Sequence, residues 1–290
     1  MTVVIGRAKI NLTLDLLGKR DDGYHELMSV MQSIDLFDRL IIRPSSELSL
    51  GMSLRSGVSK WLPQDERNDV MRAAHLLHKQ CGVSCGAEIF MEKFIPTQAG
   101  LGGGSADAAA ALIGLNKHWK LGLSDEELRD FAAQLGSDIP FNLRGGTALC
   151  RGRGEIVQPL PPLPPVYVTL FKPPRGLSTS RIFSTLNISD FEEGTSLKFV
   201  DALLSEDACM FDFMSNQLQE TACNELPELF EFTRRLRDEG VPWWQMSGSG
   251  STIFVLAKDK EQALRYRKDL APLYWWSFAT KTSDKGAELR

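Results

Sequence analysis

Hydrophobic side chains recur at every second position near the start of the chain, which is the period of a β-strand. The alternation Ile10, Leu12, Leu14, Leu16 predicts a strand over residues 10–17. Hydrophobic runs of similar character predict further strands over residues 27–36, 39–43, 87–94, 166–171 and 252–256. The first part of the chain is therefore expected to be rich in sheet.

Other segments carry the helical period. Between Asn68 and Gln80 the apolar positions Val70, Ala73, Ala74 and Leu77 lie on one face of a helix. Ser124 and Glu127 form a capping box that opens a helix ending at Gly136. Similar patterns predict helices over residues 105–118, 227–239 and 260–270. Strands and helices mix without a regular β-α-β rhythm, so we expect an α+β fold.

The segment QPLPPLPPV at residues 158–166 contains five prolines. Such a run favours an extended linker and predicts a junction between a domain at residues 1–157 and another at residues 158–290. A PxxP ligand for a partner domain is the alternative.

Composition narrows the function classes. The 290 residues carry a net charge of −4 with a pI near 5.7, which gives no basic footprint for nucleic acid. We find no signal peptide and no apolar run long enough for a membrane helix, and expect a cytoplasmic protein. The five cysteines lack CxxC spacing and are expected to be buried, reduced thiols: Cys81, Cys85, Cys150, Cys209 and Cys223.

The segment IPTQAGLGGGSADAAAAL at residues 95–112 places a glycine-rich loop between a predicted strand and a predicted helix. Glycines allow the backbone to approach an anion, and a helix N-terminus adds partial positive charge. The loop lacks the Lys-Ser or Lys-Thr of a Walker A motif and the glycine spacing of a Rossmann fingerprint. The interpretation is a phosphate-binding loop; the alternative is a flexible turn beside a tight helix–sheet contact.

Three further segments contain polar residues that allow either a functional or a purely structural interpretation. Lys9 and Asn11 share one face of an apolar strand, where Lys9 is either functional or a solvated edge lysine. Asp138 follows Gly136 and Ser137, and it is either a carboxylate beside a phosphate or the N-cap of a short helix. The segment MSGSGS at residues 246–251 is either a second anion nest or a turn.

The chain resembles the GHMP superfamily of small-molecule kinases in four segments and in their order along the sequence. These segments are AKINLTL, GLGGGSADAAAAL, LGSDIPF and MSGSGSTIF. The segment GKRDDGYHE at residues 18–26 resembles the GxRxDGYHEL segment of the members that phosphorylate 4-diphosphocytidyl-2-C-methyl-D-erythritol in the non-mevalonate isoprenoid pathway. The resemblance spans roughly residues 3–283. It implies ATP-dependent phosphorylation of the 2-hydroxyl of that substrate. The alternatives are a GHMP-type kinase for another alcohol, such as mevalonate or homoserine, and a non-catalytic binding module.

The resemblance also implies the two-domain GHMP kinase fold: a ribosomal protein S5 domain 2-like N-terminal domain and an α/β C-terminal domain, with the active site between them. It implies that Lys9 and Asp138 are the catalytic pair and that Asn11 contacts the substrate. Tyr24 and Phe183 correspond to an aromatic pair that sandwiches cytosine, and His25 to the residue that reads the base edge. The positions implied to bind ATP are Asn68, Gly100, Leu101, Gly102, Gly103, Gly104 and Ser105.

Small molecules are therefore the expected partners, with no nucleic acid and no membrane, for a monomer or homodimer. Mg²⁺ is expected to arrive with ATP, and no acidic pair in the sequence indicates protein ligands for a metal. Three positions depart from the family pattern: Arg7 stands where a proline is usual, Gln98 interrupts a small-residue segment, and Ala106 replaces a common serine.

Overall fold

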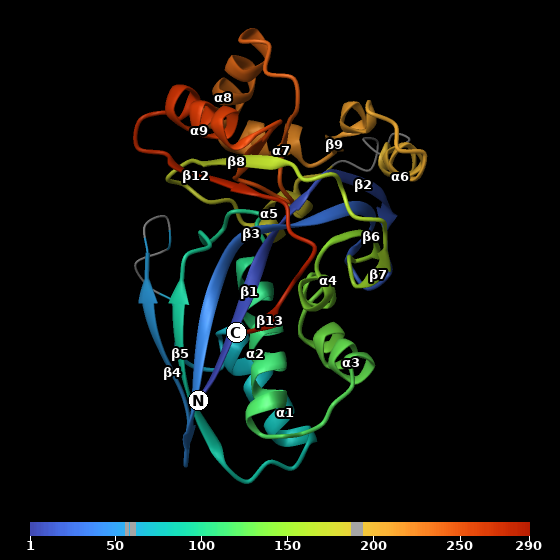
Figure 1. Cartoon of the computed structure of the whole chain (residues 1–290). Helices are drawn as coiled ribbons and strands as arrows, with labels where there is room; N and C mark the ends of the chain where they lie inside the picture. Colours follow the sequence, from blue (N-terminus) through green and yellow to red (C-terminus); the bar gives the residue numbers. More distant parts are fainter. Residues whose placement is uncertain (56–57, 59–61, 187–193) are drawn as a thin grey trace.

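The computed structural model describes residues 1–55, 58, 62–186 and 194–290. Two sheets form the frame of this part of the chain, one in the lower and one in the upper half of Figure 1. Helices cover the faces of both sheets, so the expected α+β class is confirmed.

The lower sheet is built around one long strand, β3, His25–Ser45, which pairs with four others. Its described members are β1 Thr2–Asn11, β2 Thr13–Lys19, β3, β4 Leu48–Leu54, β5 Gly86–Lys93, β6 Thr147–Gly152, β7 Ile156–Pro159, β9 Ser215–Asn216 and β13 Glu288–Leu289. The predicted break between residues 36 and 39 is wrong, because Asp38 is buried within the strand and accepts hydrogen bonds from the amides of Phe94 and Ile95.

The predicted strand over residues 10–17 straddles two real strands, so its bounds are wrong. Residues 4–16 are buried almost without interruption. The alternation of apolar and polar residues continues through the change of strand, so the pattern does not mark where one strand ends and the next begins. The chain changes strand near Leu12, where the Thr13 hydroxyl accepts a hydrogen bond from the Val30 amide at 2.9 Å.

Four helices cover one side of the lower sheet (Figure 1): α1 Asp69–Gln80, α2 Gly103–His118, α3 Asp125–Leu135 and α4 Ile139–Arg144. The helix predicted over residues 68–80 is confirmed, as is the capping box of Ser124 and Glu127. Helix α2 begins two residues before its predicted start at Ser105. Its alanines allow close packing on β1, since a Cβ at Gly6 would lie 2.1 Å from the carbonyl oxygen of Ala106.

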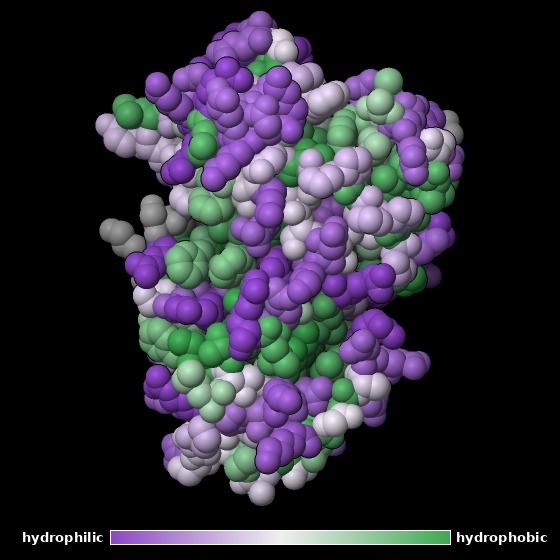
Figure 2. All heavy atoms as spheres, viewed as in Figure 1, coloured by the Kyte–Doolittle hydropathy of each residue, from purple (hydrophilic) through white to green (hydrophobic). Residues whose placement is uncertain are grey.

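The upper sheet has the order β10 Trp244–Met246, β11 Ile253–Ala257, β8 Tyr167–Lys172, β12 Trp276–Lys281. Around it lie α5 Thr179–Ser184, α6 Ser196–Leu204, the 3₁₀ helix η2 Met210–Phe213, α7 Gln219–Glu225, α8 Pro227–Asp238 and α9 Lys260–Leu270. Hydrophilic side chains gather over α8 and α9 at the top of Figure 2, as expected of helices with one face turned to water.

The proline-rich segment runs from β7 of the lower sheet to β8 of the upper sheet. Two later strands also join the lower sheet: β9 pairs with β2, and β13 at the C-terminus pairs with β1. Residues beyond 158 thus complete the lower sheet, and the division into residues 1–157 and 158–290 stays a prediction.

The cysteine prediction needs a correction. All five are free, and Cys150 and Cys223 are buried, but Cys85 and Cys209 are exposed. Both exposed thiols lie in connecting segments, which run over the surface of a fold. Among the described residues, no helix combines the length and apolar content needed to cross a membrane.

Candidate active site

A cavity of about 1010 Å³ is lined by residues from both halves of the chain. The volume lies at the upper end of the range of ligand pockets, about 300–1,000 Å³, which gives room for a large ligand or two smaller ones. Most of the predicted site residues line it: Lys9, Asn11, Tyr24, His25, Gly100, Leu101, Gly102, Gly103, Gly104, Ser105, Asp138 and Phe183. Asn68 does not; it caps α1 by accepting a hydrogen bond from the Val70 amide.

At the centre of this cavity Lys9 faces Asp138. Lys9 Nζ lies 3.5 Å from Asp138 Oδ2 and donates to Asn11 Oδ1 at 2.6 Å. Asn11 in turn donates through Nδ2 to Ser29 Oγ at 2.8 Å. The residue Lys9 is only 3 % exposed, so it is not a solvated edge lysine. The strand therefore holds an ammonium group in a fixed place beside a carboxylate.

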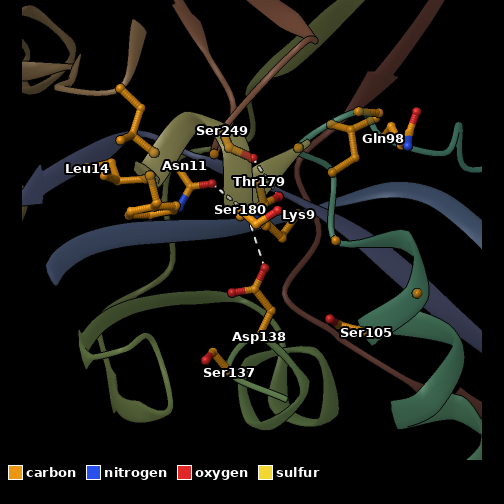
Figure 3. A pocket seen from close by; sticks show the side chains of 18 of the residues that line it. Lys9, Asn11, Leu14, Gln98, Ser105, Ser137, Asp138, Thr179, Ser180 and Ser249 are labelled. Carbon is orange, nitrogen blue, oxygen red and sulfur yellow. Dashed lines mark hydrogen bonds and ion pairs between the residues drawn. The ribbon is translucent and has the colours of Figure 1, made fainter. Parts of the chain in front are cut away.

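Asp138 occupies the N-cap position of α4, but its side chain makes no capping hydrogen bond. Figure 3 shows the carboxylate pointing away from α4 towards Lys9. Thr179 and Ser249 lie across the cavity and share a hydrogen bond of 2.8 Å between their hydroxyls. The local sequence places Asp138 at a helix start, and its charge is directed into the cavity.

The glycine loop leads into the first turn of α2, whose amides have no intrahelical acceptor. The N-cap is Gly102, in the left-handed region at φ 67°, and it has no side chain to cap them. A Cβ at Gly103 would lie 3.0 Å from Lys93 Nζ, and one at Gly104 only 2.6 Å from Asp69 Oδ2. The loop therefore places backbone N–H groups at the cavity wall with no side chain capping them.

The segment at residues 246–251 supports this loop from the upper half. Ser247 Oγ donates to the Gly100 carbonyl at 2.8 Å, and a Cβ at Gly100 would lie 1.9 Å from the Ser247 carbonyl oxygen. Asn216 holds the segment by donating to the carbonyls of Met246 and Gly248, both at 2.8 Å. Gly248 and Ser249 also line the cavity.

Aromatic side chains form another wall. The rings of His25 and Phe183 lie 5.2 Å apart, and the guanidinium of Arg153 lies 4.8 Å from the ring of Tyr24. Burial, followed by the charge of Lys19, lowers the pKa of His25 below its usual value. His25 is therefore neutral at neutral pH and has one donor and one acceptor nitrogen. The structure thus pairs Phe183 with His25, whereas the predicted sandwich pairs it with Tyr24.

The sequence reasoning missed charged residues that also line the cavity: Lys19, Asp69, Lys93 and Arg153. Lys93 is buried, forms an ion pair with Asp38, and has its Nζ 2.6 Å from Asp107 Oδ2. Two carboxylates and one ammonium are thus buried under the glycine loop. Asp38, Lys93 and Asp107 are far apart in the sequence and therefore form no recognisable motif. Only Asp107 lies in a segment that the sequence analysis had selected, the alanine-rich helix.

Two family models match the chain: the "GHMP kinases N terminal domain" over residues 68–146 and "GHMP kinases C terminal" over residues 202–271. A 4-diphosphocytidyl-2-C-methyl-D-erythritol kinase of Pelotomaculum thermopropionicum is 45% identical, over 91% of this chain and 93% of its own length. The chain belongs to the 4-diphosphocytidyl-2-C-methyl-D-erythritol kinase family.

Solved structures agree with membership of this kinase family. A crystal structure of 4-(cytidine 5'-diphospho)-2C-methyl-D-erythritol kinase matches with a TM-score of 0.80 and 33% identity, over 97% of this chain and 99% of that one. A homoserine kinase from Cytophaga hutchinsonii matches with a TM-score of 0.78 but 19% identity, over 100% and 97% of the two chains. That second likeness shows the GHMP kinase fold alone. The two family models and the 45% identical relative confirm the expected superfamily.

Proposed function

We propose that this kinase transfers the γ-phosphoryl group of ATP to the 2-hydroxyl of 4-diphosphocytidyl-2-C-methyl-D-erythritol, in the non-mevalonate isoprenoid pathway. One observation carries the proposal: the Lys9–Asp138 pair, the glycine loop and the His25–Phe183 pair open into the same cavity. The kinase would act on dissolved small molecules in the cytoplasm, as a monomer or homodimer.

Asp138 would accept the proton of the attacking hydroxyl as the new oxygen–phosphorus bond forms. Its carboxylate fits this role because it is 29 % exposed and turned into the cavity, with no helix cap to maintain. Lys9 would stabilise the negative charge between the attacking oxygen and the phosphoryl group. Asn11 and Ser29 keep the ammonium in place, so little reorganisation is needed during the reaction.

The first amides of α2 would hold the β- and γ-phosphates of ATP, helped by the partial positive charge of the helix N-terminus. Oxygen groups beside the loop fit Mg²⁺, which prefers one or two carboxylates together with phosphate oxygens. Asp69 and Ser105 line the cavity there and would hold the ion. Bound Mg²⁺ would neutralise charge on the phosphates.

Cytosine would bind at the aromatic wall, between Tyr24 and Phe183, with neutral His25 hydrogen-bonding its edge. The described cavity extends from this wall to Asp138, so one molecule with a base at one end and a hydroxyl at the other can reach both. Mevalonate and homoserine have no base to place there. The aromatic wall therefore favours the cytidine substrate over those alcohols.

The test is ADP release from ATP with three alcohols in parallel: 4-diphosphocytidyl-2-C-methyl-D-erythritol, mevalonate and homoserine. We expect kcat/KM for the cytidine substrate to exceed the other two by at least about 10³-fold, because a site built around a base leaves polar and aromatic groups unpartnered without it. Equal or higher efficiency with mevalonate or homoserine would overturn the substrate assignment and leave the kinase class intact.

A further inference from the structure

Arg153 lies in the turn between β6 and β7, and its side chain lines the cavity. Its guanidinium carbon is 4.8 Å from the centroid of the Tyr24 ring, at the aromatic wall. The next residue, Gly154, lies beside the proposed proton acceptor, since a Cβ built there would be 3.6 Å from Asp138 Oδ1. Arg153 therefore lies between the proposed base site and the proposed proton acceptor.

The guanidinium group of Arg153 has fewer close polar partners than the ammonium groups of the buried lysines in the cavity. Lys9 is held by Asn11 and Asp138, and Lys93 by two carboxylates. The ion pair of Arg153 with Glu155 is 3.7 Å long, beyond hydrogen-bond distance, and Glu155 Oε2 instead accepts from the Arg153 backbone amide at 2.6 Å. The guanidinium thus keeps donors for a ligand.

We propose that Arg153 binds the diphosphate that links the cytidine and erythritol parts of the substrate; this inference rests on the proposed function. The substrate must place that anionic group between its base and its hydroxyl, which is where Arg153 lies. A guanidinium group matches phosphate oxygens with two parallel donors. Its side chain is 28 % exposed, so the pairing is screened less than at a fully exposed site.

Tyr24 has a second role in this arrangement. Its ring holds the guanidinium by a cation–π contact on one face and leaves the opposite face for cytosine. Arg153 and Tyr24 together then recognise a nucleoside carrying a diphosphate, and Arg153 contributes to substrate selection without taking part in the proton transfer.

The test compares the binding of CDP and of cytidine by calorimetry in the wild-type kinase and in Arg153→Gln. We expect Arg153→Gln to lower the affinity for CDP at least tenfold and the affinity for cytidine less than twofold. Arg153→Lys keeps the charge and loses the paired donors, so CDP affinity is expected to fall between the two. The matched control is Arg151→Gln, because Arg151 is exposed on β6, two residues before Arg153, and does not line the cavity. This control variant should change the affinity for neither CDP nor cytidine.

Steady-state kinetics give a second readout. In Arg153→Gln we expect KM for the cytidine substrate to rise at least tenfold, with KM for ATP within twofold of wild type. An equal loss of CDP and cytidine affinity would show that Arg153 only supports Tyr24, and unchanged CDP affinity would show no contact; either result overturns this proposal alone. A wild-type kinase that binds neither CDP nor cytidine would overturn the proposed function, and this proposal with it.

Discussion

Lys9 Nζ and Asp138 Oδ2 lie 3.5 Å apart, although one residue belongs to β1 and the other to the start of α4. The fold brings them together because Asn142 on α4 donates through Nδ2 to the Arg7 carbonyl on β1, at 2.7 Å. The pair is therefore fixed by a hydrogen bond between its two supporting elements.

The glycine loop gives the first prediction. Gly103→Val should lower the affinity for a non-hydrolysable ATP analogue at least tenfold, measured by calorimetry, because the branched side chain would keep phosphate from the α2 amides. Its Cβ would also lie 3.0 Å from Lys93 Nζ, so the melting temperature must be recorded for each variant. Gly51→Val on β4, outside the cavity, is the control. Unchanged affinity in folded Gly103→Val would remove the loop from phosphate binding.

The aromatic wall gives the second. Tyr24→Ala and Phe183→Ala should each weaken binding of the cytidine substrate by about 1–3 kcal/mol, the usual contribution of a ring stacked on a base. The loss should appear in KM for that substrate, with KM for ATP little changed. Phe230→Ala, at an exposed ring on α8, should change neither constant. Wild-type kinetics in both wall variants would show that the base binds elsewhere.

Local patterns in the sequence predicted the elements whose ends carry their own signals. Helix α3 has its capping box and α1 its asparagine cap, and both start where predicted. The limits of β1 and β2 were hidden because the alternation of Ile10, Leu12, Leu14 and Leu16 continues without a break through the change of strand at Leu12. Motifs identified Lys9, Asp138 and the loop, but Lys93 and Arg153 reach the cavity only through tertiary folding. No local pattern marks such positions.

The departure at Arg7 also became clear only in three dimensions. Its guanidinium donates to the Gly286 carbonyl at 3.0 Å and to Glu288 Oε1 at 2.7 Å, so it binds the returning C-terminal segment. Residues so distant in sequence leave no periodic signal.

The buried charges below the loop give the third prediction. Burial, together with the neighbouring Asp38 carboxylate, raises the pKa of Asp107 well above its usual value, although Lys93 opposes this. Asp107 Oδ1 is buried without a hydrogen-bond donor, and a protonated Asp107 can itself donate a hydrogen bond to the neighbouring Asp38 carboxylate. Asp107→Asn, which imitates the protonated form, should therefore lower the free energy of unfolding by no more than about 1.5 kcal/mol.

Asp38→Asn should cost more, about 3–5 kcal/mol, because Asp38 accepts from two backbone amides and from Lys93. Urea denaturation of the two variants measures the difference. Equal losses, or a larger loss in Asp107→Asn, would contradict a raised pKa at Asp107.

Acid stability gives the fourth. Burial would raise the pKa of Glu288, but hydrogen bonds from Lys285 and Arg7 hold it at about 2. A depressed pKa contributes stability that is fully present above the unfolded value near 4.5 and is lost as pH falls towards 2. Glu288→Gln should therefore lower stability by roughly 1–3 kcal/mol at pH 7. The difference from wild type should shrink steadily below pH 5.

Urea denaturation between pH 7 and pH 3 measures this difference. The control is Glu239→Gln, which removes an exposed partner of Arg235 and should cost less than about 1 kcal/mol at any pH. A Glu288→Gln penalty that stays constant with pH would show that Arg7 and Lys285 do not depress the carboxyl pKa.

The most direct measurement of the central claim is the turnover of Asp138→Asn with ATP and the cytidine substrate, followed by ADP release. Because the Asp138 side chain caps no helix, the variant should keep the wild-type melting temperature and ATP affinity. Its kcat should fall by at least about 10²–10⁴-fold, the usual contribution of a proton acceptor. Asp130→Asn, at an exposed position on α3, should retain full activity. A folded Asp138→Asn variant with wild-type kcat would contradict the assignment of Lys9 and Asp138 as the catalytic pair.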